Sequence, residues 1–290
     1  MNELLVSIII AIVQGITEWL PVSSSGHLVL FERILNYRGG LMFDVALHFG
    51  TLMAVFVYFG KDIVDIVRDL VGGRFGTENG RLGILVLAAT IPAAVVGFFL
   101  KNVFEVAFSS LGIVALGFAI TGVFLLVVSV SGRGKGVPPA RLKIMQKSRS
   151  VLRGGEVAGR EERFGFVNWK KFGFAKALLV GAAQIFSLFP GISRSGATLG
   201  SGLLLGLDEK HALKFSFLMS IPIIFGANIL AIGSKTLPSE LIWATLVSFV
   251  VGLGTIHLLY GYLLTNRKNL KWFALYALAL AVVVGVLAVF

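Results

Sequence analysis

Long apolar segments alternate with short polar ones along most of the chain. A helix needs ~20 mainly apolar residues to span the hydrocarbon core of a bilayer. Six segments come close to that length, namely residues 41–59, 82–100, 111–130, 213–232, 241–264 and 272–290. The pattern therefore predicts an all-α polytopic membrane protein with about six full spans.

Two further apolar segments, residues 1–35 and 174–206, are interrupted by Pro21 and Pro190. Neither half of either segment is long enough to span a bilayer. We interpret each as a re-entrant hairpin of two half-helices, which enters the bilayer and returns to the same side. Irregular backbone at that depth is tolerated only where protein or water covers it, so both bends should lie inside the molecule.

The order of elements repeats, since each hairpin is followed by three spans. Polar residues repeat as well: Gln14 precedes Ser25 by eleven residues, and Gln184 precedes Ser195 by the same interval. Such a repeat is typical of a duplicated membrane fold, although chance similarity between apolar segments is the alternative. We predict three units: a first repeat at residues 1–130, a basic loop at 131–173 and a second repeat at 174–290.

Composition and charge fix the class and the orientation. The chain of 290 residues is 56% hydrophobic, has no cysteine and carries a formal net charge of +11. Basic residues concentrate at 61–81 and 131–173, and basic loops of membrane proteins usually face the cytoplasm, so we expect no nucleic-acid partner. The loop at 131–173 either binds anionic lipid head groups or only sets orientation.

The same charge pattern implies that the two halves are inverted. Three spans, an odd number, separate the hairpins, so the first enters from the outer side and the second from the cytoplasmic side. Hairpins from opposite faces can meet inside the bilayer, where inverted-repeat proteins place their binding sites.

The first bend reads QGITEWLPVSSSGH and carries a carboxylate, Glu18, in an otherwise apolar setting. An ionisable residue at membrane depth is costly and marks a functional site by default. Gln14 lies one helical turn before Glu18 on the same face. The bend continues with Ser23, Ser24, Ser25, Gly26 and His27. Serines followed by a helix start favour phosphate binding, because that end has free N–H groups and a positive dipole.

The second bend repeats this arrangement with Ser193, Ser195 and Thr198, and adds Arg194. Arginine offers a rigid fork of donors suited to phosphate oxygens. Because Glu18 would repel an anion, we expect it to hold a divalent cation with help from Gln14.

Several roles stay open at this point. His27 is a candidate acid, base or nucleophile, and Ser24 is a rival nucleophile. Glu18 and Arg194 could instead form a buried structural ion pair. His27 could be satisfied by a backbone carbonyl, and the serines could serve only helix packing. We interpret His48 as a possible support of the site, and Asp44 as either a support or a simple helix cap.

The two bends, QGITEWLPVSSSGH and PGISRSGAT, resemble the signature motifs of the undecaprenyl-diphosphate phosphatases, the bacitracin-resistance protein family, and the stretch FDVALHFGT also fits. The resemblance covers nearly the whole chain apart from the basic loop. It implies an enzyme of the cell membrane that removes one phosphate from a polyprenyl diphosphate, with a divalent cation (Mg²⁺ or Ca²⁺) and a site opening to the outer face. It also implies the inverted fold with re-entrant helices.

Carried over by position, the functional residues of that family fall on Glu18, Ser24, His27, Ser193, Arg194 and Thr198, with Gln14 where many members have glutamate. The expected partners are the lipid substrate and the bilayer, and a homodimer is left open. The alternative class is a transporter or flippase of a phosphorylated polyprenyl lipid, because inverted repeats with broken helices are common in transporters. A carrier would need the phosphate cradle but neither a metal ligand nor a proton-transfer group.

Overall fold

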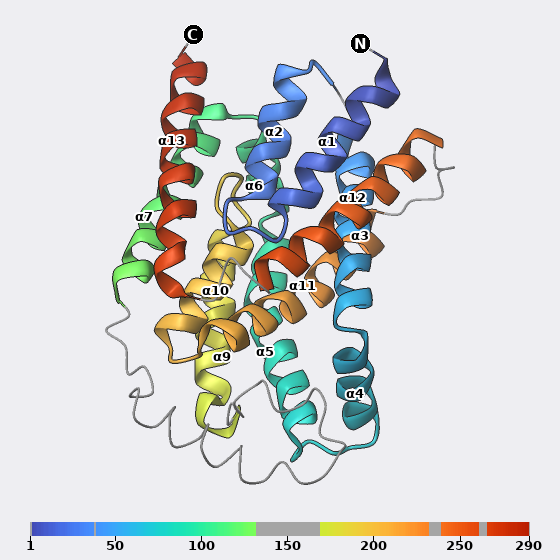
Figure 1. Cartoon of the computed structure of the whole chain (residues 1–290), viewed down its shortest axis with the longest axis vertical. Coiled ribbons are helices and arrows are strands. Elements are labelled where there is room, and N and C mark those ends of the chain that lie inside the picture. Colours follow the sequence, from blue (N-terminus) through green and yellow to red (C-terminus); the bar gives the residue numbers. More distant parts are fainter. Residues whose placement is uncertain (1, 38, 132–168, 232–238, 261–265, 290) are drawn as a thin grey trace, which may run out of the picture.

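The computed structural model describes residues 2–37, 39–131, 169–231, 239–260 and 266–289. All regular elements in these ranges are helical (Figure 1). They are α1 (Glu3–Thr17), α2 (Ser24–Ile34), α3 (Gly40–Tyr58), α4 (Gly60–Val71), α5 (Glu78–Phe99), α6 (Lys101–Phe108), α7 (Leu111–Ser131), α9 (Trp169–Phe186), α10 (Arg194–Leu204), α11 (Glu209–Ala231), α12 (Ser239–Leu258), the 3₁₀ turn η3 (Arg267–Asn269) and α13 (Leu270–Val289). The all-α prediction is confirmed for the described residues.

Six helical stretches among the described residues are long and apolar enough to span a membrane. They are Gly40–Tyr58, Glu78–Phe99, Leu111–Ser131, Glu209–Ile229, Leu241–Leu258 and Arg267–Val289. The predicted number of spans is thus confirmed, and the protein is a multi-pass membrane protein in its architecture. The inverted relation between the halves and the orientation of the basic loop stay predictions, since most of that loop lies outside the described residues.

Helix α9 begins earlier than expected, within the segment predicted as loop. Its first turn starts at Trp169, and the chain departs from helical geometry at Gly173, where φ is +73°. The turn forms because Trp169 and Phe172 are buried, packing their rings against Phe215 of α11. Burying two aromatic side chains offsets the ordering of this short segment.

Both predicted breaks are present, and the helices flanking them converge in the middle of the molecule. In Figure 1, α1 and α2 lie toward the end that carries both termini, whereas α9 extends toward the opposite end. The long helices surround these shorter ones: α7 packs along α13, α3 along α12, and α5 along α9. The two bends therefore have a shell of protein around them, as irregular backbone at membrane depth requires.

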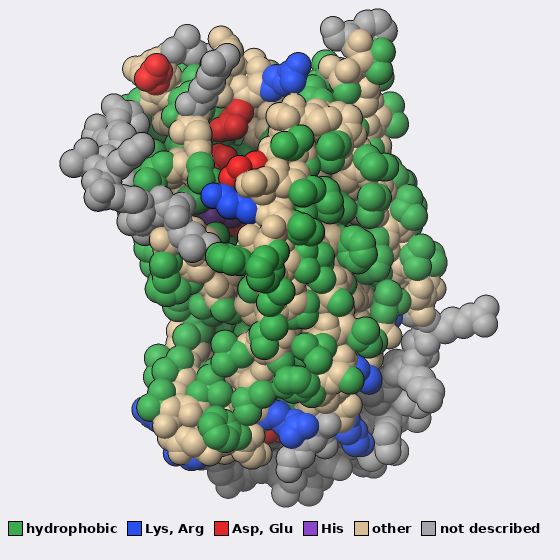
Figure 2. All heavy atoms as spheres, turned by 180° about the vertical axis from the view of Figure 1, so that it is seen from behind, with side chains coloured by type: hydrophobic (Ala, Val, Ile, Leu, Met, Phe, Trp, Pro, Cys, Tyr) green, Lys and Arg blue, Asp and Glu red, His purple; other side chains and the backbone are tan. Residues whose placement is uncertain are grey.

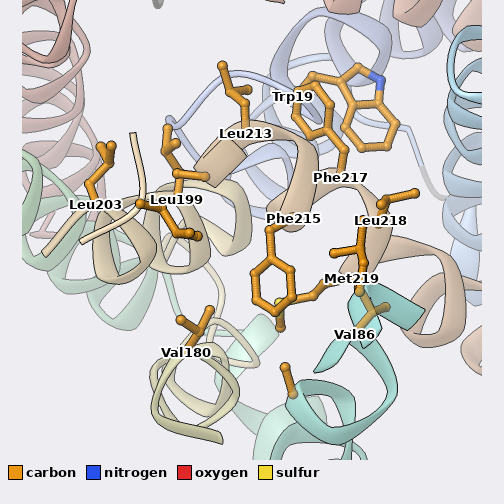
Figure 3. Close-up of a cluster of buried hydrophobic side chains, with 14 of the residues drawn as sticks. Trp19, Val86, Val180, Leu199, Leu203, Leu213, Phe215, Phe217, Leu218 and Met219 are labelled. Carbon is orange, nitrogen blue, oxygen red and sulfur yellow. The ribbon is translucent and has the colours of Figure 1, made fainter. Parts of the chain in front are cut away.

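The largest buried cluster among the described residues includes Trp19 of the first bend (Figure 3). Trp19 is fully buried and meets Phe217 of α11 edge to face, with ring centroids 5.1 Å apart. Leu199 and Leu203 extend the same cluster from α10. Aromatic and aliphatic side chains from both halves of the chain thus hold the bends at a fixed relative position.

The second bend approaches α7 so closely that two glycines are required. Gly191 has φ of +87°, and a Cβ there would lie 2.2 Å from the carbonyl oxygen of Val114. A Cβ on Gly117 would lie 2.3 Å from the carbonyl oxygen of Pro190. Thr121, one turn further along α7, donates to the Gly191 carbonyl and accepts from the Ser193 amide. These contacts satisfy backbone groups that the bend would otherwise leave unpaired.

Candidate active site

Glu18 lies at the point where the first helix ends. It is the C-cap of α1, is 5% exposed, and precedes a turn that leads to Ser23, the N-cap of α2. The Ser23 backbone has φ of +68°, a conformation that non-glycine residues rarely adopt. Such strain persists only where surrounding contacts enforce it, and it clusters at functional sites.

The Glu18 carboxylate gathers polar groups from both halves of the chain. Arg194 pairs with Oε1 through Nη2. On the other oxygen, Oε2, Ser24 Oγ donates at 2.6 Å and Gln14 Nε2 donates at 2.9 Å. The structure therefore brings together four predicted site residues, and the buried ion pair that we weighed as an alternative is present in the geometry.

The serines beside these charges are engaged in holding the two bends. Ser23 Oγ accepts from the Gly26 amide at 3.3 Å, and Ser193 Oγ accepts from the Gly196 amide at 3.0 Å. Ser25 lies 3.2 Å from Ser23 through their hydroxyls. The predicted phosphate-binding hydroxyls thus line the bends, but most already have partners within the protein.

The second bend is also tied directly to the first. Ser195 Oγ donates to the carbonyl oxygen of Leu20 at 2.8 Å. Thr198 Oγ donates to the Arg194 carbonyl at 2.8 Å and lies 2.6 Å from the hydroxyl of Ser216. A Cβ on Gly26 would lie 2.9 Å from Cα of Gly191. The two bends are in contact, as the interpretation of two converging hairpins led us to expect.

His27 is placed differently from the other predicted residues. Its Nδ1 lies 2.6 Å from the Ser23 carbonyl oxygen, and its Nε2 lies 2.8 Å from the hydroxyl of Tyr276. The carbonyl can only accept, so Nδ1 carries the hydrogen and Nε2 accepts from Tyr276. The imidazole also stacks on Tyr276 and meets Phe118 edge to face. The recorded hydrogen bonds of His27 reach neither Glu18 nor Arg194.

Three buried polar atoms around the ion pair have no hydrogen-bond partner among the described residues. They are Nη1 of Arg194, Oε1 of Gln14 and Nε1 of Trp19. Buried donors and acceptors are nearly always satisfied, so such a group needs an explanation. The guanidinium also lies over the indole of Trp19, 5.6 Å from the ring centroid. The Nη1 group of Arg194 is therefore left without an acceptor in the described part of the chain, while Nη2 holds Glu18.

Four residues of this region carried little or no sequence signal. Thr121 and Tyr276 lie within apolar spans, far along the chain from the bends that they contact. The sequence around Trp19 did not indicate that its indole would lie beside Arg194. His48 of α3 was noted only as a possible support, and its Nε2 lies 3.4 Å from Glu18 Oε2.

A recess gives access to polar groups from one face of the molecule. Figure 2 shows a mostly apolar surface on which acidic, basic and histidine side chains gather in one hollow, toward the end that carries the chain termini. Arg194 and His48 keep side-chain exposures of 14% and 27%, whereas Glu18 is nearly closed off. Ligand groups can therefore approach the ion pair without unfolding the bends.

These features define a class: a helical membrane protein with a buried polar site formed by two broken helices. A sequence model of the bacitracin resistance protein BacA family matches residues 7–283. The chain belongs to this family.

Three relatives show how far the similarity extends. The chain is 41% identical to an undecaprenyl-diphosphatase of Rubrobacter xylanophilus over 302 aligned positions, covering 99% of each protein. It is 35% identical to that of Thermosipho melanesiensis, covering 95% of this chain and 96% of the other. It is 36% identical to that of Mycobacterium leprae, covering 97% of this chain and 93% of the other. All three carry the same name and align over nearly their whole length.

Proposed function

We propose that the protein is a membrane phosphatase that removes one phosphate from undecaprenyl diphosphate, or another polyprenyl diphosphate, and so recycles the lipid carrier for cell-envelope glycan synthesis. The relatives named above support this activity. The observation that carries it is the buried guanidinium of Arg194, which pairs with Glu18 through Nη2 and leaves Nη1 unpartnered. A phosphate oxygen is the natural acceptor for that free donor.

The cradle for the diphosphate combines Arg194 with the starts of α2 and α10. Both helices begin at the contact between the bends, where backbone N–H groups and the helix dipole favour an anion. Phosphoryl transfer asks the protein mainly to position the phosphate and to neutralise charge that develops in the transition state. An arginine that is already fixed by Glu18 and Trp19 loses little freedom when it binds.

Ser24 is better placed than His27 to act on the phosphate. Its hydroxyl donates to Glu18 Oε2 at 2.6 Å, so Glu18 can take the proton as Ser24 Oγ, or a water in its place, attacks phosphorus. The bond from phosphorus to the bridging oxygen breaks as the new bond forms, and the lipid leaves as a monophosphate. On the serine route, water then hydrolyses phospho-Ser24, which releases inorganic phosphate and returns the proton to Ser24 Oγ. His27 has both ring nitrogens engaged, which favours a role in fixing the first bend against Tyr276.

A divalent cation such as Mg²⁺ or Ca²⁺ belongs to the proposal, with Glu18 and Gln14 as ligands. The unpartnered Oε1 of Gln14 fits that role, since amide and carboxylate oxygens suit these ions. The described residues contain no group of three or more His, Cys, Asp or Glu side chains that could hold a metal. Such a site therefore relies on phosphate oxygens for part of its coordination. When bound, the cation would neutralise part of the negative charge of the phosphate.

We further propose that the site opens to the outer face of the cell membrane and that the basic loop is cytoplasmic, on the charge pattern alone. The prenyl chain would lie along apolar walls of the spanning helices and reach the site laterally. A homodimer is compatible with this arrangement. Cysteine labelling from either side of intact cells, at positions such as Glu105 and Asp208, would test the orientation.

Phosphate release by the purified full-length protein tests the activity. We expect Glu18→Gln and Arg194→Ala to lower the rate by at least ~100-fold, because Arg194 would bind the phosphate directly and Glu18 would accept the proton of the nucleophile and hold the cation. Glu105→Gln is the matched control, since Glu105 is exposed and pairs with Lys101 on its own helix. Release that neither site variant changes would overturn the assignment. Movement of the lipid across vesicles without phosphate release would favour the transporter alternative.

A second pair of variants separates the two candidate nucleophiles. If Ser24 attacks phosphorus, Ser24→Ala abolishes release to the level of Glu18→Gln, and His27→Gln retains measurable release. The reverse order would assign the chemistry to His27. Thermal unfolding of both variants in detergent checks that a loss is not a folding defect.

A further inference from the structure

His48 faces Glu18 from α3 with a nitrogen that has no hydrogen to give in its neutral form. Its Nδ1 lies 2.7 Å from the backbone carbonyl oxygen of Asp44. A carbonyl accepts only, so Nδ1 carries the ring hydrogen and the lone pair is on Nε2. That lone pair lies 3.4 Å from Oε2 of Glu18. Two acceptors therefore face each other at the edge of the ion pair.

The contact does not have the geometry of a direct hydrogen bond. Charge-assisted N–H···O bonds are about 2.7–2.9 Å long, and 3.4 Å is longer. Glu18 also has no need of His48, because Oε2 already accepts from Ser24 and Gln14. In contrast, neighbouring ligands of one cation, each about 2.1–2.4 Å from it, are roughly 3.0–3.4 Å apart when they subtend a right angle. The observed separation fits two adjacent ligands.

A third potential ligand belongs to a side chain that contacts the same carboxylate oxygen. Gln14 donates to Oε2 through Nε2, and the other atom of the same amide, Oε1, is buried without a partner. Glutamine supplies no charge at this position, so Glu18 is the one carboxylate among these three side chains. The lone pair of the His48 imidazole would give the cation a further ligand where Gln14 adds no negative charge.

We propose that Nε2 of His48 is a ligand of the divalent cation, beside Glu18 Oε2 and Gln14 Oε1. This inference rests on the proposed function, and it adds a nitrogen to a site otherwise made of oxygen. Imidazole favours transition metals over Mg²⁺ and Ca²⁺, which prefer all-oxygen coordination. The protein should therefore bind Mn²⁺ more tightly than Mg²⁺, and His48 should be the cause of that preference. The side chain of His48 is 27% exposed, which leaves part of the imidazole accessible to an ion.

Mn²⁺ binding to the purified full-length protein in detergent tests the proposal without any turnover. We expect His48→Ala to weaken Mn²⁺ binding by about 10–100-fold and to reduce the preference for Mn²⁺ over Mg²⁺. His211→Ala is the matched control, because His211 pairs with Asp208 at the start of α11 and should leave Mn²⁺ binding unchanged. Electron spin echo spectra of bound Mn²⁺ should show coupling to an imidazole nitrogen, and His48→Gln should abolish it.

The outcomes separate this inference from the proposed function. Mn²⁺ affinity within twofold of the parent protein in His48→Ala, or no nitrogen coupling in the parent protein, would overturn the assignment of His48. If phosphate release is intact in that case, the phosphatase assignment stands. If the parent protein binds Mn²⁺ through nitrogen but releases no phosphate, the metal site stands and the function fails. Should His48→Ala not fold, His48→Gln and the parent spectrum decide the matter.

Discussion

The two bends start their second helices with the same local contacts. Ser23 and Ser193 are both N-caps, each accepting from the amide three residues later. Each also lies 3.2 Å from the serine two positions on, Ser25 in one bend and Ser195 in the other. The shared part of the motif therefore builds the helix starts, and the positions that differ are those to which our proposal assigns the chemistry.

Those differences are complementary. Positions 170 residues apart correspond, so Ser24 matches Arg194, and both are the first residue of their helix. Both donate to the same carboxylate, Glu18, whose own counterpart is Leu188. The first bend supplies the carboxylate of the ion pair, and the second bend supplies its guanidinium. The comparison teaches that two similar scaffolds have been given opposite halves of one ion pair.

The largest expected effect comes from removing the ion pair between the two bends. Arg194→Leu should lower phosphate release by at least ~1,000-fold and destabilise the protein by about 3–5 kcal/mol, because it leaves a buried carboxylate unpaired. Adding Glu18→Leu, which gives the first bend the residue type of Leu188, should restore most of the stability and none of the activity. Thermal unfolding in detergent and a phosphate assay measure the two effects. Activity in the double variant would mean that the pair is only structural.

The backbone of the second bend is the next most sensitive feature. Gly191→Ala should destabilise the protein by about 3 kcal/mol, since its φ is +87° and the new Cβ would collide with the Val114 carbonyl. Gly60→Ala is the control, because a Cβ there meets nothing within 4 Å. We expect its melting temperature to stay close to that of the parent protein. Equal shifts for both variants would show that the approach of α7 is not tight.

The two capping serines should respond unequally to glycine. Ser193 has ordinary φ of −73°, so Ser193→Gly loses the cap, adds backbone entropy to the unfolded chain and costs about 1 kcal/mol. Ser23 has φ of +68°, so Ser23→Gly loses the same cap but relieves strain, and its stability should change by less than about 0.5 kcal/mol. Denaturation of both variants in the same detergent compares them. A larger loss at Ser23 would contradict the assigned strain.

The smallest effect should come from the two corresponding glutamines, and it should differ in sign. Gln184 is buried with neither amide atom partnered among the described residues, so Gln184→Met should stabilise the protein by up to about 1 kcal/mol. Gln14→Met removes a donor to Glu18 and should destabilise it by a similar amount. Melting temperatures of the two variants test the contrast. Destabilisation by both would indicate that Gln184 has a bound partner of its own.

The sequence alone could predict the bends and the groups on them, because proline, serine and isolated charges in apolar segments are local signals. It could also predict that Glu18 and Arg194 lie near each other, once the two bends were expected to meet. It could not predict Thr121, Tyr276 or the contact of His48, because these side chains sit in apolar helices without a local pattern. Their roles depend on which face of each long helix packs against the bends, and tertiary packing alone determines that.

The hydrogen bond from Ser195 to the Leu20 carbonyl crosses between the two halves of the chain, as does the pairing of Arg194 with Glu18. Neither half therefore contains all the residues of the proposed site. If residues 1–131 and 169–290 were made as separate polypeptides, each would be inert, and activity would appear only when they assembled. A substitution that weakens the contact between the two fragments should abolish activity before it unfolds either fragment.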